Sequence, residues 1–128
     1  MGIHLTIEER ESYILAVTSG KREEGRQVDS AIEIFQKIGI ACREKGINKI
    51  LFISKATGKL GVFNVLFILE NFERIGWSRE FQLAYVNLNE NTLPDTRFGE
   101  NAAANRGYHK IKVFANEERA REWLMIDM

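Results

Sequence analysis

Short apolar runs alternate with longer amphipathic segments along the whole 128-residue chain, and this alternation restricts the fold more than any other feature of the sequence. Apolar and polar residues alternate over residues 3–7, and a second apolar run at residues 13–17 follows a charged stretch. These two runs predict an antiparallel hairpin. Residues 28–42 then carry apolar side chains at three-and-four spacing, which predicts a long amphipathic helix that ends near Gly46.

The remainder of the chain repeats a pattern of one strand followed by one helix. Apolar runs predict strands at residues 49–53, 81–86 and 111–114. Helical spacing predicts three further helices, at residues 62–72, at residues 98–107 and after an N-cap at Asn116. The predicted order is therefore β-β-α-β-α-β-α-β-α. Strands that alternate with helices favour parallel pairing, so we expect an α/β fold with a mixed, mainly parallel sheet and the hairpin as its antiparallel edge.

Length and charge narrow the class of protein. The 128 residues predict a single domain over residues 1–128, and 18 basic against 18 acidic residues give a net charge of zero, which argues against nucleic acid as a partner. The longest apolar stretch, residues 62–69, is too short to span a membrane, and charges at residues 8–11 interrupt any secretory signal. The lone Cys42 cannot form an internal disulfide. These features lead us to expect a cytoplasmic protein.

Two segments carry a resemblance to a known family. The apolar strand at residues 50–53, the small-residue loop after it and the sequence LGVF at residues 60–63 resemble the STAS domains, specifically the SpoIIAA-like group that includes anti-sigma-factor antagonists. The sequence VFANEERAREWL at residues 113–124 is similar to the closing strand and helix of an uncharacterised bacterial STAS-like subgroup. The resemblance covers almost the whole chain. It implies a SpoIIAA-like single domain that acts as a non-catalytic signalling or ligand-sensing module in a bacterium.

In antagonist members of the family, a Ser or Thr after the central strand receives a phosphate that controls docking to a kinase-like partner. The motif there is Asp-Ser-Ser-Gly-Leu-Gly. When residues 60–61 are aligned with its Leu-Gly, Thr57 and Gly58 take the positions of the two serines. Ala56 and Lys59 stand where the motif has Asp and its first Gly. The resemblance thus implies a protein partner of a kinase-like or anti-sigma type.

Physical chemistry points to the same loop, residues 54–59. A loop between the carboxyl end of a parallel strand and the start of a helix offers free backbone N–H groups and a favourable dipole to anions, and two lysines add positive charge. One interpretation is a site for phosphate, an acidic ligand or a protein partner; the other is that Ser54 or Thr57 only caps the helix. The candidate site residues are Ser54, Lys55, Thr57, Gly58 and Lys59.

The predicted helix at residues 62–72 has more apolar surface than one core can cover. Phe63, Phe67 and Ile68 lie off the main apolar stripe of this helix. Three interpretations stay open: simple burial, a homodimer face, or the wall of a pocket for a small apolar or acyl ligand. The last of these makes a carrier of such a ligand the alternative to a regulatory module.

The sequence offers no assembled catalytic or metal-binding motif. His4 and His109 have no carboxylate or thiol at a metal-binding spacing, and Cys42 lies on an apolar helix stripe where a small thiol packs well. No nucleophile, base and orienting group come together from motifs. We therefore expect binding without turnover, no catalytic residues, no metal and no cofactor.

Overall fold

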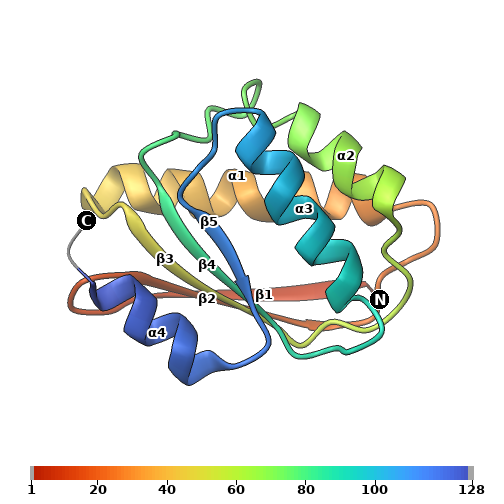
Figure 1. Cartoon of the computed structure of the whole chain (residues 1–128), viewed down its shortest axis with the longest axis horizontal. Helices are drawn as coiled ribbons and strands as arrows, with labels where there is room; N and C mark the ends of the chain where they lie inside the picture. The colour runs from red at the N-terminus through yellow and green to blue at the C-terminus, as the bar shows by residue number, and fades with distance from the viewer. Residues whose placement is uncertain (1, 127–128) are drawn as a thin grey trace.

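The structure, a computed structural model, describes residues 2–126 and contains the predicted order of five strands and four helices in that range (Figure 1). The strands are β1 (Ile3–Glu9), β2 (Ile14–Gly20), β3 (Lys49–Ser54), β4 (Gln82–Asn87) and β5 (Ile111–Phe114). The helices are α1 (Gln27–Lys45), α2 (Val62–Glu70), α3 (Leu93–Asn105) and α4 (Glu117–Met125).

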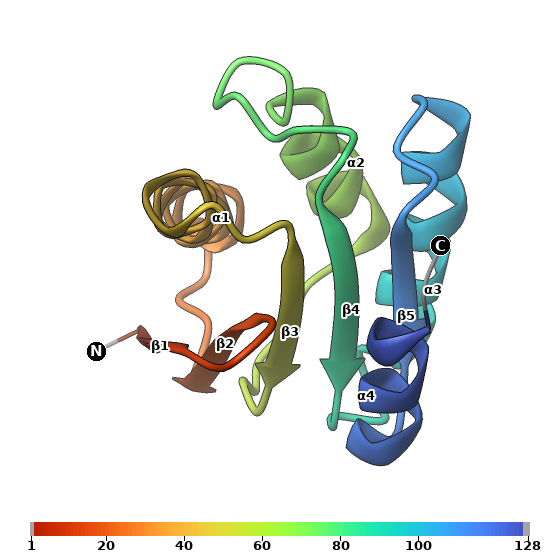
Figure 2. The ribbon, with the colours of Figure 1, turned by 90° about the vertical axis from the view of Figure 1, so that its left-hand side faces the viewer.

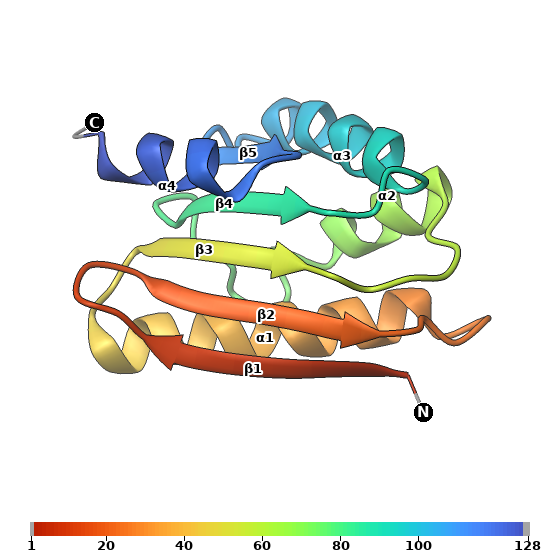
Figure 3. The same cartoon turned by 90° about the horizontal axis from the view of Figure 1, so that it is seen from below.

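The strands form one mixed sheet in the order β1-β2-β3-β4-β5. β1 and β2 pair as an antiparallel hairpin, whereas β2, β3, β4 and β5 run parallel (Figure 3). The prediction of an α/β fold with a mainly parallel sheet and an antiparallel edge is confirmed. Because the parallel strands point the same way, their carboxyl ends lie at the same end of the sheet. Residues 55–61 leave β3 at that end (Figure 2).

Helices cover the sheet unequally on its two faces. α1, α2 and α3 lie on one face and α4 lies on the other (Figures 1 and 3). Side chains alternate between the faces along a strand, so Ile50 and Phe52 of β3 join the core beneath the three helices, while Leu51 and Ile53 join the core beneath α4. This double coverage explains why β3 is an almost continuous apolar run in the sequence.

Helix ends follow the local sequence closely at three of the four helices. α1 ends with Gly46 in the left-handed conformation at φ 66°, and the Asn116 side chain accepts a hydrogen bond from the Arg119 amide at 3.0 Å at the start of α4. α3 begins at Leu93, five residues before Phe98, where the apolar spacing predicted its start, and Pro94 fits the first turn of the longer helix.

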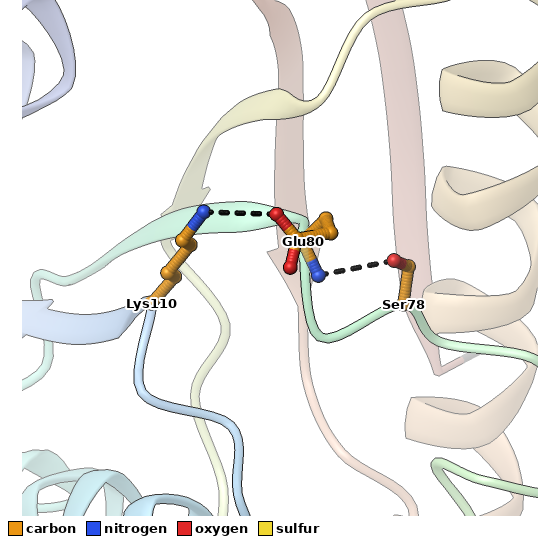
Figure 4. Close-up of polar contacts among 3 residues, drawn as sticks. All are labelled: Ser78, Glu80 and Lys110. Carbon is orange, nitrogen blue, oxygen red and sulfur yellow. Dashed lines mark hydrogen bonds and ion pairs between the residues drawn. The ribbon is translucent and has the colours of Figure 1, made fainter. Parts of the chain in front are cut away.

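Surface polar contacts lie near the amino-terminal ends of β4 and β5. Lys110 pairs with Glu80 at 3.2 Å, and the Glu80 amide donates to the Ser78 hydroxyl at 3.0 Å (Figure 4). Both ion-pair partners are exposed, so the pair adds little to stability. Across residues 2–126, no helix combines the length and apolar character that crossing a membrane requires.

Candidate functional site

A cavity of about 110 Å³ lies between the sheet and the three helices that cover it. Its walls are mainly apolar and include Phe52 from β3, Ala31 from α1 and Val65 and Leu69 from α2. α3 contributes a small residue, Gly99, where an added Cβ would come within 2.9 Å of a Val65 methyl. A mostly apolar concave site with a few polar groups is the usual form of a small-molecule site.

The segment from Ser54 to Leu60 forms part of this cavity and part of the protein surface. Burial alternates along it: Ser54, Ala56 and Leu60 are buried and line the cavity. Between them, the side chains of Lys55, Thr57 and Lys59 are exposed. The predicted loop residues are therefore brought together on one segment, with the lysines and Thr57 facing outward and Ser54 facing inward.

The backbone of this segment is not the free anion receptor that the sequence suggests. The Lys55 amide donates to the Thr18 carbonyl at 2.8 Å, and the Thr57 amide donates to the Gly20 carbonyl at 2.9 Å. The segment thus continues the parallel pairing of β2 and β3 beyond the strand ends. The expectation of free amide donors is wrong at Lys55 and Thr57, because pairing with a neighbouring chain segment cannot be read from local sequence.

The capping interpretation is also wrong for both hydroxyl residues. α2 begins only at Val62, its N-cap is Gly61, and no side chain within residues 2–126 caps it. The Gly61 amide instead donates to the Asp95 carboxylate at 3.0 Å, which ties the start of α2 to α3. The Thr57 hydroxyl donates to the Gly20 carbonyl at 3.4 Å.

Gly58 permits a close approach between this segment and the loop that follows β2. It has a φ of 90°, which favours glycine, and an added Cβ would lie 3.1 Å from the Arg22 amide nitrogen. The Arg22 guanidinium donates to the Gly58 carbonyl at 3.0 Å and to the Thr57 carbonyl at 3.5 Å. Arg22 is thereby held at the cavity, whose lining it joins.

The cavity has a polar end at the carboxyl edge of the sheet. Thr18, Ser54 and Tyr85 come from three neighbouring strands and line it there. The Tyr85 ring stacks on Phe52 at 4.6 Å between centroids. Burial raises the pKa of the Tyr85 phenol, and the Arg22 charge and hydrogen bonding to Ser54 and Arg22 oppose that rise. The phenol therefore stays protonated at neutral pH and can donate a hydrogen bond.

The three apolar residues singled out on α2 lie on different sides of the helix. Ile68 is buried and lines the cavity, whereas Phe63 and Phe67 are 75% and 53% exposed on the outer side. Apolar periodicity alone could not tell the buried residue from the two exposed ones, since all three lie off the main apolar stripe of the helix. A role of Phe63 and Phe67 as a homodimer face stays a prediction.

Cys42, His4 and His109 lie outside the lining of the cavity. Cys42 is 1% exposed, and burial raises the pKa of its thiol to about 11, against a lowering by the nearby Arg43 charge. His4 lies exposed on β1, and His109 is exposed in the turn before β5. Within residues 2–126, no three His, Cys, Asp or Glu side chains are grouped as metal ligands.

The sequence did not point to Arg22 or Tyr85, which line the polar end of the cavity. Arg22 lies in a charged loop and reaches the carbonyl of Gly58, 36 positions further along the chain, so no local pattern marks it. In the sequence, Tyr85 resembles any other apolar residue of a strand. It lines the cavity because β4 lies between β3 and β5 in the sheet.

Comparison with known proteins supports the fold and goes no further. No protein-family model matches the chain, and a search of curated proteins found no match. Among solved structures, it is similar to an uncharacterized protein of the DUF3478 family with a SpoIIAA-like fold from Shewanella loihica PV-4. The two share 19% sequence identity with a TM-score of 0.53, and the match covers 96% of this chain and 94% of that one. Together with the strand order and the two-sided helix coverage, this match shows that the chain has the SpoIIAA-like fold.

Proposed function

We propose that the protein is a non-catalytic sensing module that binds a small, mainly apolar molecule in the cavity beneath α1, α2 and α3. The cavity is the observation that carries this proposal. An engineered apolar cavity of about 150 Å³ in another protein stays dry and binds benzene. A cavity of about 110 Å³ with apolar walls therefore suits a molecule near the size of one aromatic ring.

The segment at residues 54–60 supports a sensing role in addition to binding. Its buried side chains line the cavity, and its exposed side chains belong to the same short stretch of backbone. A ligand that shifts Ala56 or Leu60 would also shift Lys55, Thr57 or Lys59 at the surface. A protein partner that contacts these three side chains would then bind the filled and empty forms with different affinity.

A cavity-filling substitution tests ligand binding. We expect Ala31→Leu to weaken the binding of toluene by at least about tenfold, because the larger side chain occupies the space that the ligand needs. The thermal midpoint should stay the same or rise, since the added methyl groups fill a void. Isothermal titration calorimetry measures the first effect and thermal unfolding the second.

The matched control is Ala41→Leu, which makes the same change on the same helix at a half-buried position outside the cavity lining. It should bind toluene like the unaltered protein. Equal binding by all three proteins, or no binding of toluene by the unaltered protein, would contradict the proposal.

Exposure of Thr57 favours a second, compatible function as a phosphate switch at the partner surface. The Thr57 side chain is exposed beside Lys55 and near Lys59 in sequence, whereas Ser54 is 1% exposed. A phosphate at Thr57 would change the surface charge by about two units and alter docking of a partner.

We expect kinases in an extract of the producing cells to place phosphate on Thr57 and not on Ser54, because only Thr57 is accessible to an enzyme. Tandem mass spectrometry maps the modified residue, and Thr57→Val serves as the unmodifiable control. Phosphate on other residues only, with Thr57 left unmodified, would refute the switch and leave the cavity proposal intact.

A further inference from the structure

The polar end of the cavity is built from side chains that can donate hydrogen bonds. Thr18 and Ser54 are 2% and 1% exposed, and they face each other in the pairing of β2 with β3. Tyr85 of β4 lies on the same side of the sheet, where its phenol is adjacent to the side chains of Ser54 and Arg22. Three hydroxyl groups thus line one end of a mainly apolar space.

Arg22 brings a positive charge to this end. Its guanidinium donates to two backbone carbonyls, those of Thr57 and Gly58, which carry no net charge. Within residues 2–126, no carboxylate forms an ion pair with Arg22. A guanidinium has five N–H donors, so two carbonyls leave donors for a ligand.

The acidic group of the lining does not neutralise Arg22. Glu100 of α3 also lines the cavity, but its carboxylate accepts the Val113 amide of β5 at 2.6 Å. That bond holds the Glu100 carboxylate at β5, next to the strand that carries Tyr85 and three positions along the sheet from β2, which leads into Arg22. Glu100 therefore forms no ion pair with Arg22, whose guanidinium keeps its positive charge at this end of the cavity.

We propose that the molecule bound in the cavity is a small monocarboxylic acid, with its carboxylate at Arg22 and Tyr85 and its apolar body between Phe52 and α2. A guanidinium and a neutral phenol are both donors, as a carboxylate requires. One guanidinium balances one negative charge, whereas a phosphate dianion would leave an uncompensated charge beside apolar walls. This inference rests on the proposed function and adds the chemical class of its ligand.

Benzoate and its uncharged isostere benzamide test the inference. We expect the unaltered protein to bind benzoate about tenfold more tightly than benzamide, since a hydrogen-bonded charge pair adds that much affinity. In Arg22→Gln the preference should disappear, because the glutamine removes the charge that distinguishes benzoate from benzamide. Titration calorimetry measures all four affinities, and circular dichroism checks that the variant is folded.

Lys21→Gln is the matched control, because it removes a positive charge from the neighbouring exposed residue, which does not line the cavity. It should keep the preference for benzoate. If the unaltered protein binds toluene and benzamide but binds benzoate no more tightly than benzamide, the carboxylate inference fails and the proposed function stands. If it binds none of the three probes, the proposed function fails first and the inference fails with it.

Discussion

Replacement of Phe72 by alanine is expected to lower the free energy of unfolding by about 3–5 kcal/mol, the range for removal of a buried phenylalanine. Phe72 is 2% exposed and follows α2 into the core. Its ring centroid lies 5.1 Å from that of Phe35, 5.3 Å from that of Trp77 and 5.6 Å from that of Tyr108. The substitution would remove contacts to all three rings and leave a void that rigid neighbours cannot fill.

Phe67→Ala is the matched control, since Phe67 is the same residue type five positions earlier and is 53% exposed. We expect it to change stability by less than about 0.5 kcal/mol. Urea unfolding followed by circular dichroism compares the two variants. Similar losses at both positions would mean that the outer side of α2 is covered, against the placement described above.

A second large loss of stability is expected on the opposite face of the sheet. Leu124 of α4 is 0% exposed and packs with Leu51, Ile53 and Val86, so Leu124→Ala should cost about 2–5 kcal/mol. These partners lie on β3 and β4, whose hydrogen-bonded pairing leaves them little freedom to close the void. Urea unfolding again measures the loss.

Met125→Ala, at the adjacent and 49% exposed position, should leave stability within about 0.5 kcal/mol of the unaltered protein. A small effect of Leu124→Ala would show that α4 does not seal the second core. Because the two cores lie on opposite faces, the losses from Phe72→Ala and Leu124→Ala should add in the double variant.

Much of the fold follows from patterns within about ten residues. Alternation in β1, the continuous apolar run of β3 and the helical stripe of α1 each identify one element, because each pattern reports which faces of that element are buried. Asn116 and Gly46 mark helix ends through hydrogen bonds and backbone conformations that are local. The parallel pairing then follows from the alternation of strands and helices, whereas the order of the strands in the sheet comes from the structure.

The cavity site was less predictable than the fold, because contacts between residues far apart in the sequence form it. The pairing of residues 55–57 with the chain after β2 takes up amides that local sequence leaves free. The cavity depends on how three helices rest on one sheet, and Arg22 reaches it from a loop 36 positions before Gly58. Even the division of α2 between the buried Ile68 and the exposed Phe63 required the positions of α1 and α3.

A methyl-resolved NMR titration with toluene tests the central claim most directly, because it reports on both faces of the sheet in one experiment. If the molecule binds in the cavity, signals of Val65 and Leu69 should shift and saturate, while those of Val86 and Leu124 on the other face should not move. Unchanged signals from Val65 and Leu69, or equal shifts on both faces, would contradict a ligand site beneath α1, α2 and α3.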